Sequence, residues 1–245
     1  MRHREEKRIV AGADKAILFI HGIIGTPDHF ADFVKLVPKD VSVYNILLEG
    51  HGGTVTDFSK ASMKKWERQV SCVVEELLRD HKALYIAAHS MGTLLAIEQA
   101  VKHSKVKYLF LMAVPIKLLL KPQMVSNSCK VYFNKVRPED ALALAAKECC
   151  GITHDKNIFK YLGWTPRFLE LFTKIRLTRK LLPQLKTKSR AYQSQKDEMV
   201  ARSSAAYLKR NSVIDAVNLE NSTHYHYGGT DRAYLLEEFA HLWEQ

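Results

Sequence analysis

Long hydrophobic runs are missing from this sequence. None of its apolar stretches approaches the length of a membrane-spanning helix, about eighteen residues, and the first fifteen residues, MRHREEKRIVAGADK, lack the apolar segment of a secretory signal. Only 4 of the 245 residues are cysteines, and two of these, Cys149 and Cys150, are adjacent. Few and adjacent cysteines are typical of free thiols in a reducing compartment. The expectation is a cytoplasmic protein without a membrane span.

Motifs for nucleotides and nucleic acids are missing as well. Neither G-x-x-x-x-G-K nor G-x-G-x-x-G occurs, which argues against phosphate-binding loops. The net charge is +11, and the whole excess lies in residues 116–190, where 16 Lys and Arg accompany only 5 Asp and Glu. No aromatic-interleaved basic motif accompanies this segment, so no nucleic-acid partner is expected. An anionic surface or an acidic protein remains a candidate partner for the segment.

Apolar runs of strand length alternate with segments of helical periodicity in most of the chain. The expected strands are residues 16–20, 41–48, 84–89, 106–114, 189–194 and 213–219. The expected helices of this pattern are residues 28–36, 62–81, 91–103, 201–209 and 231–244. Continuous apolar strands are typical of a sheet that is covered on both faces. The sequence therefore predicts a mostly parallel, doubly wound α/β sheet.

The alternation stops between residues 116 and 188. No strand is evident there, and five of the seven prolines lie in or next to this region. Its amphipathic stretches are residues 124–135, 138–150 and 166–182. We expect a helical cap, residues 116–185, inserted into an α/β core of residues 1–115 and 186–245, because insertions at the carboxyl ends of the strands cover the ligand crevice. A purely structural helical layer is the alternative.

The stretch 171–182, LFTKIRLTRKLL, is the most basic part of this cap. Its pattern is typical of a packed helix with a solvated basic face. An alternative interpretation is that the helix rests on an anionic lipid surface or an acidic protein.

The pentapeptide Ala88-His89-Ser90-Met91-Gly92 joins an expected strand to an expected helix. A strand–turn–helix with small residues two positions before and after a serine is the context of a nucleophile elbow. The helix start would place Ser90 at the positive end of a dipole. His89 occupies the variable position of the motif and is expected to point away from the site.

A serine nucleophile needs a histidine base, and the histidine needs a carboxylate that fixes its tautomer. Both follow Ser90 in the order expected for this fold type, each after a strand. Asp197 is the first acid after the strand 189–194, and we prefer it to its neighbour Glu198. His224 follows the strand 213–219, and we prefer it to His226 because it lies nearer to the strand end.

An oxyanion hole is the remaining requirement, since losing one of its donors can cost about 10²–10³ in rate. The Met91 N–H at the helix start is the first expected donor. The second is expected in the loop after an early strand, where His21-Gly22-Ile23 lies, and we assign it to the Ile23 N–H.

Taken together and in order, these motifs resemble those of the α/β-hydrolase superfamily. Besides the elbow and the loop after residue 20, the resemblance includes Gly50-His51-Gly52 and Asn221-Ser222-Thr223-His224. The pattern is most similar to small bacterial carboxylesterases and monoacylglycerol-lipase-like enzymes, although Ala88 stands where the usual motif has glycine.

The resemblance implies hydrolysis of short- to medium-chain acyl esters or monoacylglycerols through an acyl-serine intermediate, without a metal or organic cofactor. Two alternatives accompany this hypothesis. One is a thioesterase or carrier-ester hydrolase that recruits an anionic substrate or an acidic acyl-carrier protein through the basic cap. The other is a hydrolase fold that has lost catalysis and serves as a binding protein. The sequence does not indicate the oligomeric state or the physiological substrate.

Overall fold

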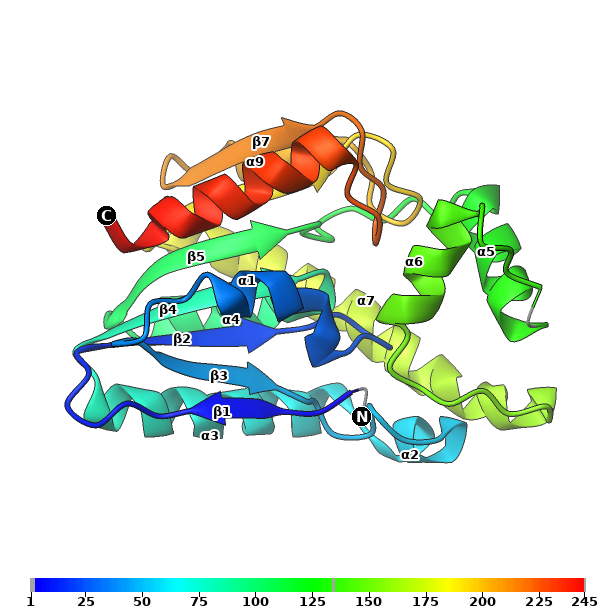
Figure 1. The fold of residues 1–245 in the computed structure, drawn as a ribbon, viewed down its shortest axis with the longest axis horizontal. Coiled ribbons are helices and arrows are strands. Elements are labelled where there is room, and N and C mark those ends of the chain that lie inside the picture. Colours follow the sequence, from blue (N-terminus) through cyan, green and yellow to red (C-terminus); the bar gives the residue numbers. More distant parts are fainter. Residues whose placement is uncertain (1–2, 134, 245) are drawn as a thin grey trace.

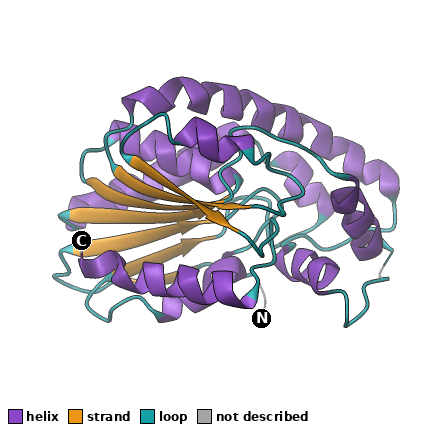
Figure 2. Cartoon of the chain, turned by 90° about the horizontal axis from the view of Figure 1, so that it is seen from above, coloured by secondary structure: helices purple, strands orange, loops and turns teal. Residues whose placement is uncertain are grey.

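The computed structural model describes residues 3–133 and 135–244. Within them, a seven-stranded sheet in the order β1-β3-β2-β4-β5-β6-β7 forms the centre, and helices cover both of its faces (Figures 1 and 2). β1 is antiparallel to β3, whereas the other neighbouring strands run parallel. The predicted α/β class and the mostly parallel sheet are confirmed.

The elements follow the expected alternation closely. The strands are β1 (Glu6–Arg8), β2 (Lys15–Ile20), β3 (Ser42–Ile46), β4 (Ala83–His89), β5 (Val106–Met112), β6 (Lys188–Ser194) and β7 (Ile214–Leu219). The α-helices are α1 (Ala31–Lys35), α2 (Val55–Lys60), α3 (Met63–Asp80), α4 (Met91–Lys102), α5 (Pro122–Tyr132), α6 (Ala141–Cys149), α7 (Thr165–Leu181), α8 (Ser203–Leu208) and α9 (Gly229–Ala240). The 3₁₀ helices are η1 (Pro27–Phe30), η2 (Ile158–Trp164), η3 (Leu182–Gln184) and η4 (His241–Glu244).

Alternating side chains of the strands supply two hydrophobic layers, one on each face of the sheet. In β2, Leu18 and Ile20 belong to the larger layer, which also receives side chains from α3, α4 and α7. Ile17 and Phe19 belong to the smaller layer under α1 and α9. Because successive strand residues point to opposite faces, a strand between two such layers is apolar along its whole length.

The parallel register aligns the carboxyl ends of the strands at one edge of the sheet. Ile20 at the end of β2 pairs with Ala88 in β4, and Ala88 pairs with Leu111 in β5. Met112 at the end of β5 pairs with Tyr192 in β6. The loops after β2, β4, β6 and β7 therefore meet at this edge, as Figure 1 shows. These are the loops to which the sequence assigns the site.

One strand and one α-helix were not expected from the sequence. β1 has the sequence Glu-Lys-Arg, which carries no apolar signal, and it forms the charged edge of the sheet. α2 begins with a capping box, in which the Thr54 hydroxyl accepts the Asp57 N–H and the Asp57 carboxylate accepts the Thr54 N–H. The T-x-x-D spacing was a visible signal for that helix start.

The helices α5, α6 and the start of α7 lie beyond the carboxyl ends of the strands (Figure 1). The chain reaches them through residues 117–121, which run antiparallel to residues 197–201. The Leu119 N–H donates to the Met199 carbonyl, and the Lys121 N–H donates to the Glu198 carbonyl, each over 2.9 Å. The first segment of the cap is thus hydrogen-bonded to the loop that carries Asp197.

The sequence predicts that the basic side chains of residues 171–182 face the solvent, and this prediction is wrong for Lys174. This side chain is 3% exposed, and its ammonium lies 2.6 Å from the Glu67 carboxylate of α3 and forms a second ion pair with Glu98 of α4. Ile175, next to it, joins the larger hydrophobic layer. The second half of α7 therefore packs on the core. The predicted division between cap and core at residue 185 stays a prediction.

The positive charge of residues 116–190 is not confined to the cap either. Lys188 is the first residue of β6. Lys186, Lys188 and Arg190 therefore lie at the amino end of that strand, on the side of the sheet away from the carboxyl ends of the parallel strands. Within the described residues, no helix combines the length and the apolar character needed to cross a bilayer.

We expect Lys174→Ala to lower the free energy of unfolding by about 2 kcal/mol, because it leaves the partly buried carboxylates of Glu67 and Glu98 without their shared cation. Lys180→Ala, an exposed position on the same helix, is the matched control and should change it by less than about 0.5 kcal/mol. Urea denaturation followed by circular dichroism measures both. Equal stability of the two variants would contradict this role of Lys174.

Candidate active site

Ser90 occupies the turn between β4 and α4 in a strained backbone conformation. Its φ is 51° and its ψ is −123°, in a region that residues other than glycine rarely adopt. The turn brings α4 so close to β2 that a Cβ atom on Gly92 would lie 2.2 Å from the Ile20 carbonyl oxygen. Ala88 packs fully buried between β2 and β5. The small residues on either side of Ser90 are therefore required by packing, and alanine fits at position 88.

A chain of hydrogen bonds joins Ser90, His224 and Asp197. The Ser90 hydroxyl donates to His224 Nε2 over 3.0 Å, and His224 Nδ1–H donates to Asp197 Oδ2 over 2.9 Å. Because an ionised carboxylate can only accept, the bond to Asp197 assigns the proton to Nδ1 and leaves the Nε2 lone pair facing the serine. All three side chains are buried. The arrangement orients the serine hydroxyl for transfer of its proton.

The two neighbouring acids hold different parts of His224. Asp197 Oδ1 accepts the N–H groups of Met199 and Val200, both over 2.7 Å, so the loop itself fixes the carboxylate. Glu198 Oε2 accepts the backbone N–H of His224 over 3.0 Å. Asp197 therefore contacts the imidazole, as the sequence interpretation preferred, and Glu198 contacts the backbone.

His226, the alternative base, takes part in the turn after His224. Its N–H donates to the Thr223 hydroxyl over 3.2 Å, and its carbonyl accepts the Thr223 N–H over 2.8 Å. His224 is the histidine that the structure brings to Ser90.

The loop after β2 lies directly against the serine. A Cβ atom on Gly22 would fall 2.9 Å from Ser90 Cβ, so the close approach requires glycine. The loop turns sharply, with Gly25 N–H donating to the Gly22 carbonyl over 3.0 Å and Ile24 at a φ of 53°. Ile23 lines the same cavity as Ser90. Met91 is the first residue of α4, and its N–H has no acceptor within the helix.

His21 stabilises this loop through two hydrogen bonds. Its Nδ1–H donates to the Gly22 carbonyl over 2.9 Å, and its Nε2 accepts the Leu48 N–H over 3.1 Å. Both ring nitrogens are used with one proton, which requires a neutral imidazole. Burial lowers the pKa of His21 to about 4, so this form persists at neutral pH.

The sequence matches the model of the alpha/beta hydrolase family over residues 17–235, which includes every residue of this cluster. The chain belongs to the alpha/beta hydrolase family. No curated protein matches the sequence, so the further comparisons are with solved structures.

Solved structures of similar fold cover nearly the whole hydrolase. One comes from work on the metagenome-derived lipolytic enzymes LipS and LipT, with a TM-score of 0.75, 17% identity and coverage of 98% of this chain and 97% of that chain. The monoacylglycerol lipase of Paleococcus ferrophilus has a TM-score of 0.68 and 13% identity, with coverage of 98% and 99%. A thioesterase domain from the curacin biosynthetic pathway has a TM-score of 0.60 and 16% identity, with coverage of 96% and 98%. At these identities the likeness shows the fold alone.

The charges of the hydrolase site depend on the pairing of His224 with Asp197. Burial alone would lower the pKa of His224, but the charge and hydrogen bond of Asp197, together with the charge of Glu198, outweigh burial and raise that pKa above the usual 6.5. Burial alone would raise the pKa of Asp197, but His224 and the N–H donors of its own loop hold that pKa below the usual 3.8. Asp197 is thus ionised at neutral pH and stabilises an imidazolium at His224.

An apolar cavity of about 530 Å³ opens in front of Ser90 and His224 and extends under the cap. Cap side chains in its wall include Met124, Val131, Tyr161, Phe168, Leu171 and Phe172. Among the residues that the structure describes, no lysine or arginine lines it. The thiol of Cys149 also lines it, and burial raises the pKa of that thiol to about 12, so it stays protonated. The cavity has the character of a binding site for an apolar group.

Sequence reasoning missed the roles of His89 and Glu198. His89 points away from the cavity, as expected, but its Nε2–H donates to the His224 carbonyl over 3.0 Å. Burial lowers the pKa of His89 well below 6.5, so it acts as a neutral donor. Together with Glu198 it holds the backbone of His224 from both sides. Neither contact has a local sequence signal, since each joins residues from separate loops.

We expect labelling of Ser90 by a fluorophosphonate to accelerate with rising pH and to level off above the raised pKa of His224, because only the neutral imidazole accepts the serine proton. In Asp197→Asn the carboxylate that raises this pKa is gone, so the midpoint should move to lower pH and the rate should fall by about 10⁴. Asp215→Asn, which changes a well-exposed carboxylate in β7, is the control. An unmoved midpoint in Asp197→Asn would contradict the assignment.

Proposed function

We propose that this alpha/beta hydrolase cleaves esters of neutral acyl chains, either simple carboxylic esters or monoacylglycerols, through an acyl-serine intermediate. The single observation that carries the proposal is the unbroken chain of hydrogen bonds from Ser90 through His224 to Asp197 at the end of an apolar cavity. A serine hydroxyl becomes a nucleophile when a correctly oriented base accepts its proton.

In the first half-reaction, Ser90 Oγ attacks the ester carbonyl and His224 Nε2 takes the hydroxyl proton. The carbonyl oxygen becomes an oxyanion, and the N–H groups of Ile23 and Met91 are the proposed donors to it. Asp197 stays ionised and stabilises the imidazolium. His224 then gives the proton to the departing alcohol oxygen, which leaves the acyl group bonded to Ser90.

In the second half-reaction, a water takes the place of the alcohol. His224 removes one proton from the water, and the water oxygen attacks the acyl carbon. The same two N–H groups donate to the oxyanion that forms. The bond to Ser90 Oγ breaks, and His224 returns the proton to the serine. The products are the free carboxylic acid and the original enzyme, so the cycle needs no further reactant.

The lining of the cavity is what supports a neutral acyl chain as the substrate. Its wall is mostly aliphatic and aromatic, and its charged member among the described residues, Glu198, is an acid whose Oε2 is bonded to the His224 N–H. A carboxylate or phosphate of a substrate would lose its hydration there without gaining a cation. The basic residues of the cap lie outside this cavity, so they do not favour an anionic group within it.

Ser90→Ala should lower the hydrolysis of p-nitrophenyl esters by about 10⁴- to 10⁶-fold while the circular dichroism spectrum is unchanged. Ser104→Ala, at an exposed loop position, should keep the full rate and serves as the matched control. An active Ser90→Ala variant would overturn the proposed nucleophile. A wild-type protein that is folded but inactive on every ester would support the binding-protein alternative.

The acyl chain itself gives the second test of the proposal. We expect kcat/KM to rise about three- to fourfold for each added methylene until the cavity is filled, because each methylene leaves water. A chain of equal length that ends in a carboxylate should react at least about 100-fold more slowly, independently of salt. Faster turnover of the anionic ester, with a steep salt dependence, would favour the carrier-ester alternative.

A further inference from the structure

Helix α7 exposes apolar side chains while it buries a lysine. Leu169, Phe172 and Leu177 are 59%, 48% and 50% exposed, whereas Lys174 of the same helix is 3% exposed. A helix on the surface of a protein normally shows the reverse distribution. These three exposed side chains of α7 would be more stable in contact with an apolar environment than in water.

The same surface continues onto the preceding helix η2. Ile158, Phe159 and Leu162 are 62%, 76% and 68% exposed. We name these six residues of η2 and α7 the η2–α7 face. Ten of the twelve large hydrophobic side chains that are exposed in the described part of the chain lie in residues 116–185, and six of them belong to this face. Exposed apolar side chains that gather in one segment mark an interaction surface, whereas scattered ones do not.

Substrate binding does not account for this exposure. Ile158 and Phe172 line the wall of the active-site cavity, so the face borders that cavity. Phe159, Leu162 and Leu169 are more than half exposed and do not line it. Another apolar occupant is needed to cover them.

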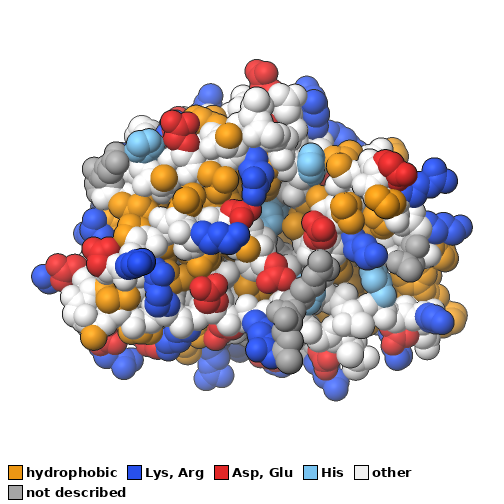
Figure 3. Space-filling model, viewed as in Figure 1, with side chains coloured by type: hydrophobic (Ala, Val, Ile, Leu, Met, Phe, Trp, Pro, Cys, Tyr) orange, Lys and Arg blue, Asp and Glu red, His pale blue; other side chains and the backbone are white. Residues whose placement is uncertain are grey.

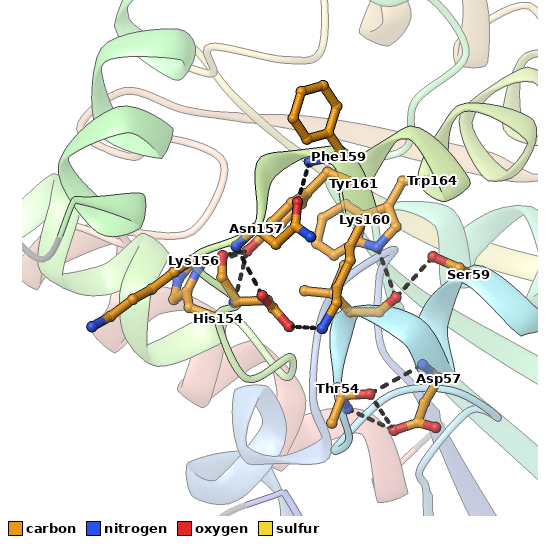
Figure 4. A network of polar contacts seen from close by, with 12 residues as sticks. Thr54, Asp57, Ser59, His154, Lys156, Asn157, Phe159, Lys160, Tyr161 and Trp164 are labelled. Carbon is orange, nitrogen blue, oxygen red and sulfur yellow. Dashed lines mark hydrogen bonds and ion pairs between the residues drawn. The ribbon is translucent and has the colours of Figure 1, made fainter.

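A polar network holds η2 in this orientation, as Figure 4 shows. The Trp164 indole N–H donates to the Val55 carbonyl of α2 over 3.1 Å, and Asn157 Oδ1 accepts the Phe159 N–H over 3.1 Å. Lys160 pairs with Asp155 at 2.5 Å. The Phe159 ring points away from this network. Its exposure is thus fixed by the structure around it.

Positive charges accompany the face. Lys156, Arg176 and Lys180 are exposed and have no carboxylate partner among residues 3–133 and 135–244, whereas Arg167 pairs with Glu170. Figure 3 shows hydrophobic side chains together with Lys and Arg, and also some Asp and Glu, over the part of the cap that faces the viewer on the right. The combination of large apolar side chains and unpaired cations is that of a surface which lies in the interface of an anionic bilayer.

We propose that the η2–α7 face docks on an anionic phospholipid bilayer. The apolar side chains would enter the acyl boundary, and Lys156, Arg176 and Lys180 would lie among the headgroup phosphates. A second copy of this chain fits less well, because a two-fold interface would place the same positively charged surface of both copies together. Since Ile158 and Phe172 border the cavity, docking places its mouth at the lipid surface. The docking itself does not depend on catalysis.

Co-sedimentation with unilamellar vesicles tests this proposal directly. The Ser90→Ala protein should sediment with vesicles of phosphatidylcholine and phosphatidylglycerol, and at least about tenfold less with phosphatidylcholine alone or at high salt. Phe159→Ser with Leu162→Ser should lower the partition coefficient by at least about tenfold. Ile9→Ser with Leu36→Ser, two exposed hydrophobic positions outside the cap, is the matched control and should bind as before.

The outcomes separate this proposal from the proposed function. The Phe159→Ser and Leu162→Ser variant, with an active Ser90, should hydrolyse a soluble p-nitrophenyl ester at the wild-type rate, because neither side chain lines the cavity. Failure of the protein to bind vesicles of either composition, or binding that the double variant retains, would overturn the docking proposal alone. A dimer in light scattering that the double variant dissociates would overturn it in favour of a second copy.

Discussion

The parallel alignment of four strand ends is the constraint on which this site depends. Ser90, Asp197, His224 and the Ile23 loop come from distant parts of the chain, and each follows a strand that ends at the same edge of the sheet. The sheet is buried on both faces, so its register cannot slip without exposing apolar side chains. Its stability therefore also fixes the distances between the site residues.

The turn at Ser90 depends on this alignment of the strand ends. Gly92 lets α4 approach the Ile20 carbonyl, and the approach forces Ser90 into its strained backbone conformation. Packing of the surrounding residues maintains this strained conformation, which orients the Ser90 hydroxyl towards His224. His89 and Glu198 then hold the backbone of that histidine, while Asp197 holds its ring. The imidazole is oriented before any substrate arrives, which is how a preorganised site lowers the cost of proton transfer.

Features with a local signal could be predicted from the sequence. The buried strands, the small residues around Ser90 and the order of serine, acid and histidine follow from spacing and residue type, and the structure brings the three side chains together. β1 escaped prediction because its three residues are charged and carry no apolar signal, and its pairing with β3 joins residues that lie far apart in the chain. The burial of Lys174 could not be predicted from the sequence either, because its partners Glu67 and Glu98 lie far from it in the chain.

Mass spectrometry of the intact protein, quenched within the first turnover of a long-chain p-nitrophenyl ester, tests directly whether Ser90 carries the acyl group during turnover. We expect one added acyl group per chain, located by peptide mapping on Ser90, which appears before steady turnover and disappears as the ester is consumed. Ester hydrolysis without such an adduct, or an adduct on another residue, would contradict it.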